Sequence, residues 1–210
     1  MQDRYEREQD LKYEAMKQKK ERGRKTIRRF FGHFCVIFAG NAFALVFYWM
    51  FMSKYVLEQL MDGKLPLGAV LGFAAIAQLA IMILSASLYM NNDEERRLLL
   101  DASREEGFTR TGWYKKTLGR IEFWTLPVTF FVFQLPFIIF SAAIGVPYVS
   151  NSLFCHFFVP QMFSCSLIGT GIGFIDAFFG AVLNVLLMTV IHGIVIYIAQ
   201  GKWRKARIRD

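Results

Sequence analysis

The chain has 210 residues, of which 54% are hydrophobic and 20% are charged, and its formal net charge is +8. Soluble domains average roughly 45–50% apolar and about 25% charged residues. Here the charged residues are grouped in blocks with long uncharged segments between them. This pattern excludes an ordinary soluble domain and predicts an all-α integral membrane protein. In such a protein the basic excess indicates contact with anionic lipid headgroups and no nucleic acid partner.

Four segments are long and apolar enough to cross a bilayer. A hydrocarbon core about 30 Å thick needs roughly 20 apolar residues in each helix. The segments that meet this requirement are 30–52, 67–90, 121–146 and 172–199. We therefore predict four transmembrane helices arranged as two hairpins.

The segment before the first predicted span, residues 1–29, holds eleven Lys/Arg and six Asp/Glu. Opposite charges stand four residues apart, as in Glu8 and Lys12, which stabilises a solvated helix. We expect a charged helix in the cytoplasm. This segment is also too long and too polar for the first region of a signal peptide, so span 30–52 is expected to remain in the mature protein.

The Lys/Arg residues predict the orientation. Segment 1–29 contains eleven, segment 91–120 seven and tail 200–210 five, whereas 53–66 contains two and 147–170 none. Positively charged segments stay on the cytoplasmic side of a membrane. The chain is thus predicted to be a multi-pass cell-membrane protein with both termini and segment 91–120 in the cytoplasm.

Segment 91–120, called the bridge below, is predicted to be an amphipathic helical connection between the second and third spans. Connections between helices usually have about 4–6 residues. The bridge is much longer than is needed to connect two spans. Trp113 and Tyr114 suit the lipid interface, but anionic lipid would repel the acidic residues before them. We therefore expect a protein partner here, docked by Asp101, Arg104, Glu105, Glu106, Gly107, Trp113 and Tyr114.

Part of the bridge resembles a known motif. Residues 101–107, DASREEG, followed by 108–116, are similar to the E-A-A-x-x-x-G coupling loop of ABC importer permeases. The resemblance implies a cytoplasmic loop that docks onto an ATPase subunit. Asp101 replaces the first Glu, Ser103 replaces the second Ala, and the closing I-x-L-P is absent. Four spans are also fewer than such permeases have, so the similarity is an analogy.

Polar residues within the spans are the candidates for an internal site. Such residues form interhelical hydrogen bonds worth about 0.6 kcal/mol each on average. The predicted members of this network are Gln78, Gln134, Asn184 and His192.

Asp176 is the acidic residue in an apolar block away from the cytoplasmic ends of the spans. An ionisable residue inside a span is a functional candidate, because burying its charge is costly. Counting about 20 residues from Ala199 towards the outside, however, places Asp176 at the outer headgroup level. An interfacial position is the expectation that we favour.

The uncharged segment 147–170 is predicted to lie in the outer interface or to dip back into the membrane. It contains Cys155 and Cys165, which an oxidising exterior would allow to form a disulfide. Free thiols packed among apolar side chains are the alternative, and the sequence leaves both open.

The sequence shows no catalytic constellation, no metal-ligand spacing and no cofactor motif. We expect a non-enzymatic subunit of a transport or envelope complex that docks a partner through residues 101–116. The alternative is a small transporter or channel. Its path would follow the third span, which contains Pro127 and Pro136, and would include Asp176 and Asn184.

The predicted orientation can be tested with single cysteines in a cysteine-free variant. K17C, R104C and R207C should resist a membrane-impermeant thiol reagent in intact cells, whereas N151C should react. Labelling of R104C from outside would contradict four spans with a cytoplasmic bridge.

Overall fold

The computed structural model describes residues 2–52, 67–90, 118–144 and 156–207, and no strand occurs among them. Four helices are long and apolar enough to cross a membrane. The prediction of an all-α chain with four apolar helices of membrane-spanning length is therefore confirmed. The predicted amphipathic bridge lies almost entirely in 91–117, outside the described residues, so it stays a prediction together with the pairing into hairpins. The helices are α1 (Gln2–Phe47), the π-helical η1 (Tyr48–Met52), α3 (Leu67–Met90), α6 (Ile121–Ile144), α8 (Val159–Ile168) and α9 (Gly173–Arg207).

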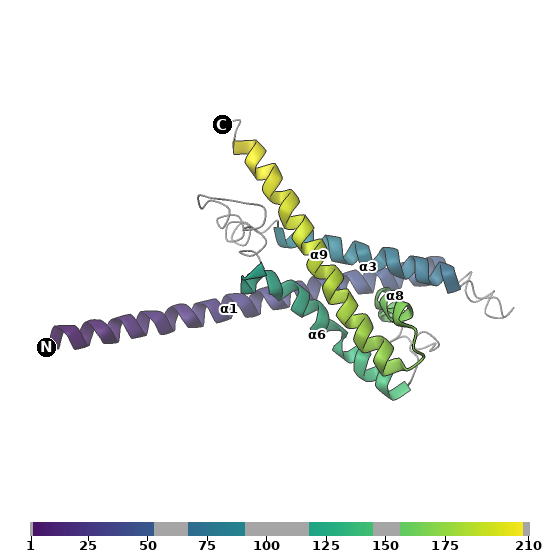
Figure 1. Ribbon diagram of the computed structural model, residues 1–210, viewed down its shortest axis with the longest axis horizontal. Helices are drawn as coiled ribbons and strands as arrows, with labels where there is room; N and C mark the ends of the chain where they lie inside the picture. The colour runs from purple at the N-terminus through teal and green to yellow at the C-terminus, as the bar shows by residue number, and fades with distance from the viewer. Residues whose placement is uncertain (1, 53–66, 91–117, 145–155, 208–210) are drawn as a thin grey trace.

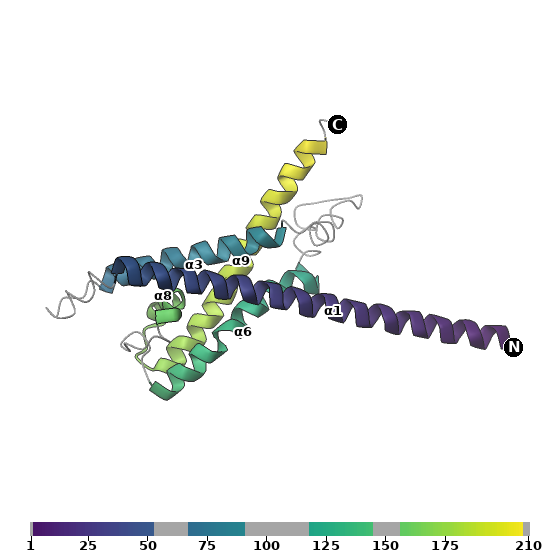
Figure 2. The same cartoon turned by 180° about the vertical axis from the view of Figure 1, so that it is seen from behind.

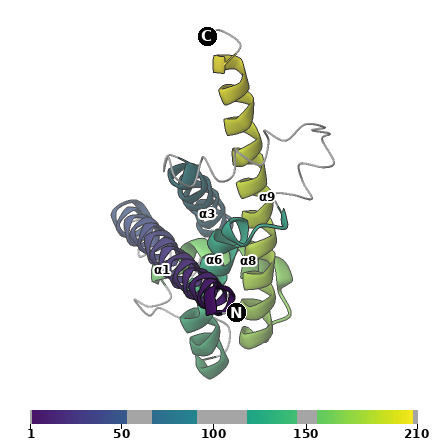
Figure 3. The ribbon, with the colours of Figure 1, turned by 90° about the vertical axis from the view of Figure 1, so that its left-hand side faces the viewer.

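Helix α1 joins the charged head and the first apolar segment in one continuous element of 46 residues. At about 1.5 Å per residue it is about 69 Å long, more than twice the hydrocarbon thickness of about 30 Å. Figure 1 shows its N-terminal half extending well away from the other helices. The C-terminal end of α9 also extends beyond the region where the helices meet (Figures 1 and 3).

The long helices form two pairs that cross each other. Helices α1 and α3 lie side by side, as do α6 and α9, and the second pair crosses the first at an angle (Figures 1 and 2). The short helix α8 packs against α9 and α3 and also contacts α1. It is viewed nearly along its axis in Figure 1, so it runs across the long helices. Part of the apolar segment 147–170 is therefore a helix buried among the spans.

Phenylalanine rings fill the space where α1, α6 and the start of α8 meet. The ring centroid of Phe133 on α6 lies 5.4 Å from that of Phe34 on α1 and 5.5 Å from that of Phe158. Phe137, one turn along α6, stacks on Phe158 at 5.2 Å. Aromatic pairs in such arrangements add about 0.5–1.5 kcal/mol each beyond the burial of their surface.

Gly180 allows α8 to approach α9 closely. A Cβ atom at Gly180 would lie 2.9 Å from the backbone nitrogen and 2.9 Å from the Sγ of Cys165. Because one of these atoms is backbone, no side-chain rotation relieves the clash. A Cβ at Gly72 on α3, by contrast, would meet no heavy atom within 4 Å.

The substitution G180A should therefore reduce stability by about 1–3 kcal/mol, since it overpacks the contact between α8 and α9. The matched control G72A should leave stability unchanged or raise it by up to about 1 kcal/mol, because alanine is the better helix former. Unfolding titrations in mixed detergent micelles measure both. Equal stability of the two variants would contradict the close contact at Gly180.

Candidate functional site

Four buried polar side chains meet in the middle of the bundle, one from each of four helices. They are Gln78 on α3, Gln134 on α6, Ser164 on α8 and Asn184 on α9, and we call them the polar layer. Each is at most 2% exposed. Gln78 and Gln134 stand near the middle of helices that both have 24 residues, so the layer lies at about half the depth of the apolar spans.

Asn184 is the centre of this layer. Its Nδ2 donates to Gln134 Oε1 at 2.7 Å, and its Oδ1 accepts hydrogen bonds from Gln78 Nε2 and from Ser164 Oγ. Gln78 Nε2 also donates to Ser164 Oγ at 3.0 Å. The layer thus links four helices through side chains alone. The structure brings together three of the residues predicted for an interhelical network.

Four polar side chains of α6, including Gln134 of the polar layer, bond to the backbone of their own helix. The donors are Thr125 Oγ1, Thr129 Oγ1, Gln134 Nε2 and Ser141 Oγ, each to a carbonyl three or four residues earlier at 2.6–2.9 Å. A membrane interior provides no water for these groups, so local bonds of this kind allow polar residues in a span. The helix continues through both Pro127 and Pro136.

Ser164 reaches the layer because residues 159–168 form a helix. Pro160 stands in its first turn, where a missing backbone N–H costs nothing. Gly169 ends it in the left-handed conformation, with φ 59°, and its N–H donates to the Cys165 carbonyl at 3.2 Å. Ser164 was not among the residues predicted for the network, although the spacing of Pro160 and Gly169 is a recognisable signal for this helix.

Asp176 is fully buried in the protein and stands in the first turn of α9. This burial is compatible with the favoured position at the outer headgroup level, which stays a prediction. The Oδ1 of Asp176 accepts hydrogen bonds from the backbone N–H of Thr170 at 2.8 Å and from Thr170 Oγ1 at 2.7 Å. Its Oδ2 accepts one from the N–H of Gly171 at 3.1 Å. The carboxylate therefore holds the turn between α8 and α9. Asn184, which was predicted to line a transport path together with Asp176, is two helical turns or about 12 Å further along α9.

His192 lies apart from the polar layer. It stands two turns beyond Asn184 on α9, and its ring lies parallel to that of Phe123 on α6, with 4.8 Å between centroids and 8° between planes. A rise of about 12 Å separates two turns of a helix, which is too far for a direct bond to the polar layer. His192 serves the contact between α6 and α9.

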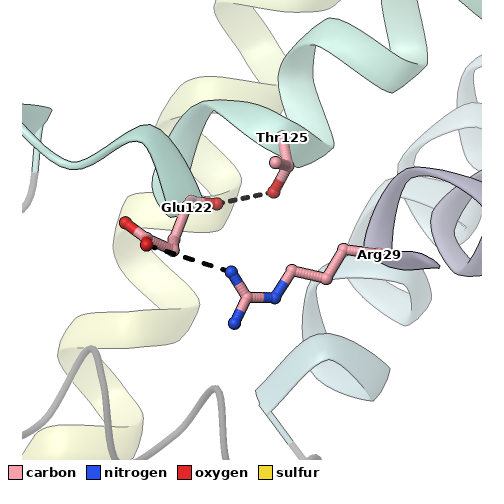
Figure 4. A network of polar contacts seen from close by, with 3 residues as sticks. All are labelled: Arg29, Glu122 and Thr125. Atoms are coloured by element: carbon pink, nitrogen blue, oxygen red, sulfur yellow. Dashed lines mark hydrogen bonds and ion pairs between the residues drawn. The ribbon is translucent and has the colours of Figure 1, made fainter. Parts of the chain in front are cut away.

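An ion pair joins α1 to the start of α6. Arg29 Nη1 lies 3.9 Å from Glu122 Oε1, and Thr125 Oγ1 donates to the Glu122 carbonyl at 2.6 Å (Figure 4). Glu122 stands in the first turn of α6, where the helix dipole favours a negative charge. The pair marks the end of the apolar region at which the charged half of α1 begins.

The other predicted site residues are only partly described. Residues 101–114, predicted to dock a partner, and Cys155 lie outside the described residues. Cys165 is a free thiol in the structure, and its Sγ donates to the Gln161 carbonyl at 3.4 Å. The choice between a disulfide and two thiols stays a prediction.

The chemistry available in the polar layer is neutral hydrogen bonding. Its members are three amides and one hydroxyl, none of which carries a charge. In the part of the chain that the structure describes, no group of three or more His, Cys, Asp or Glu side chains could hold a metal ion. The layer suits structural cohesion or the binding of a neutral polar molecule.

Comparison with known proteins found no similar protein. No protein-family model matches the chain, and neither a curated protein nor a solved structure is significantly similar to it. The similarity of residues 101–116 to importer coupling loops is therefore without support from any family.

The substitution N184L should reduce stability by about 2 kcal/mol, because it removes three interhelical hydrogen bonds of about 0.6 kcal/mol each. The control S141A removes a buried hydroxyl that donates to the Phe137 carbonyl of its own helix, and it should cost less than about 1 kcal/mol. Detergent unfolding titrations compare the two variants. If N184L proves no less stable than S141A, the layer does not hold the helices together.

Proposed function

We propose that the protein is a non-enzymatic subunit of a membrane complex, in transport or envelope work, and that it docks a protein partner at the cytoplasmic face through residues 101–116. The observation that carries this proposal is the length of its helices. Helix α1 has 46 residues and α9 has 35, whereas about 20 residues suffice to cross the hydrocarbon core. Much of both helices is therefore available outside the bilayer.

The sequence composition supports a role for these extensions. Segment 1–29 and tail 200–210 together contain 16 of the 25 Lys/Arg residues, and the positive-inside rule assigns both to the cytoplasm. Tyr13 and Met16 on α1 are 68% and 64% exposed. The bridge starts after α3 and ends at α6, both of which contact α1. The bridge and the extension of α1 would then face the same compartment.

The polar layer also favours this role over a transport path. Its side chains bond to one another and to the backbone, and they are almost completely buried. A path through a bilayer needs polar groups that face a passing solute. The bonded layer instead suits a bundle in which the interior side chains hold the helices together and the charged ends recognise a partner.

The test is a double charge reversal, E105K/E106K, in the full-length protein. We expect normal membrane insertion and loss of the proteins that co-purify in mild detergent, because the acidic turn is the part of the bridge that lipid anchoring leaves unexplained. Quantitative mass spectrometry of the purified complexes measures the change.

The matched control is E94K/E95K, which makes the same charge change in the same bridge but outside 101–116. It should keep the co-purifying proteins. If both variants retain them, the bridge is a connector that lies on lipid and the docking proposal fails. Equal loss from both variants would assign the effect to net charge and would also reject a specific docking turn.

A small transporter or channel is the second candidate, and one observation favours it. Transport sites lie near the middle of the bilayer, where helices are interrupted. The short helix α8 brings Ser164 to about half the depth of the apolar spans. Solute flux into liposomes, compared between wild type and N184L, tests this candidate. Equal flux from protein-free and protein-containing liposomes would reject it.

A further inference from the structure

One buried polar side chain next to the polar layer has no hydrogen-bond partner among the described residues. Gln161 on α8 is fully buried, and neither its Nε2 nor its Oε1 makes a hydrogen bond there. Every amide of the polar layer, by contrast, bonds through both its nitrogen and its oxygen. Gln161 is therefore as buried as the amides of the polar layer but lacks their hydrogen bonds.

An unpartnered amide is costly in this position. A glutamine amide carries two N–H donors and an oxygen with two lone pairs, and burying such a group without partners in apolar surroundings is strongly unfavourable. The cost is highest inside a bilayer, where no solvent reaches the group. A molecule that both donates and accepts hydrogen bonds would remove this cost.

The surroundings restrict what that molecule can be. Gln161 precedes Ser164 by three residues, so both lie on the same face of α8, and α8 packs against α3, α9 and α1. A second buried acceptor without a partner among the described residues, Asn41 Oδ1, belongs to α1. The neighbouring polar layer consists of amides and a hydroxyl, so it offers no opposite charge for the recognition of an ion. Complete burial favours the smallest molecule of this chemistry.

We propose that the amide of Gln161 binds ordered water inside the bundle and that this water extends the polar layer along α8. Buried waters typically make about three hydrogen bonds to polar groups that would otherwise lack partners, and one amide supplies both a donor and an acceptor. The layer is then a hydrated neutral site between α8 and the long helices. This inference does not depend on the proposed docking function.

The test uses the full-length protein in lipid nanodiscs with ¹⁵N-labelled glutamine. The side-chain amide of Gln161, assigned by its loss in Q161L or in Q161A, should show a nuclear Overhauser effect to water with the sign that marks long-lived bound water. Gln134 is the matched control, because it is 1% exposed and its amide bonds to Phe130 and Asn184. Its effect should be at least several-fold weaker.

A second measurement is the melting temperature of Q161L. Leucine has nearly the volume of glutamine, so it should not raise the melting temperature if the amide is hydrated, since it removes a satisfied group. A rise of several degrees would show that the amide is buried dry, because removing an unsatisfied polar group stabilises a protein. Either that rise or the lack of a water signal at Gln161 would overturn the proposal.

Discussion

The absence of water in a bilayer is the constraint on which this fold depends. Every polar group within the apolar spans needs a hydrogen-bond partner inside the bundle, because the lipid supplies none. Asn184 illustrates the consequence, because its amide joins Gln78, Gln134 and Ser164 and thereby connects α3, α6, α8 and α9. Apolar packing alone would let these helices rotate or slide, since lipid tails are as apolar as the side chains that they replace. The directional bonds of the layer select one arrangement.

Helix α8 makes that arrangement possible. It lies close to α9 because Gly180 lacks a side chain, and its start is held by the phenylalanines of α6. The carboxylate of Asp176 then holds the turn that leads into α9. Three kinds of interaction, namely close backbone approach, aromatic packing and charge-assisted hydrogen bonds, thus place Ser164 in the polar layer. This explains why an uncharged segment between two spans is a structural part of the bundle.

The interior of the protein and the ends of its long helices differ in chemistry. Inside, most side chains are apolar, and the neutral side chains of the polar layer bond to one another. Outside, α1 and α9 extend beyond the length that a bilayer requires, and the ion pair of Arg29 with Glu122 lies where the charged half of α1 begins. The proposal that a partner is recognised at the charged segments is consistent with this division.

The sequence alone determined the helical class, the four apolar spans and the charge asymmetry, because hydropathy, length and Lys/Arg counts are properties of local segments. Only the tertiary structure decided which polar residues meet. Gln78 and Ser164 are 86 residues apart, and Gln78 and Asn184 are 106 apart, so their contact depends on how each helix is rotated and tilted against the others. The same reason separates His192 from the layer. The periodicity of a sequence gives angles around one helix axis, whereas a contact between helices requires the placement of two axes relative to each other.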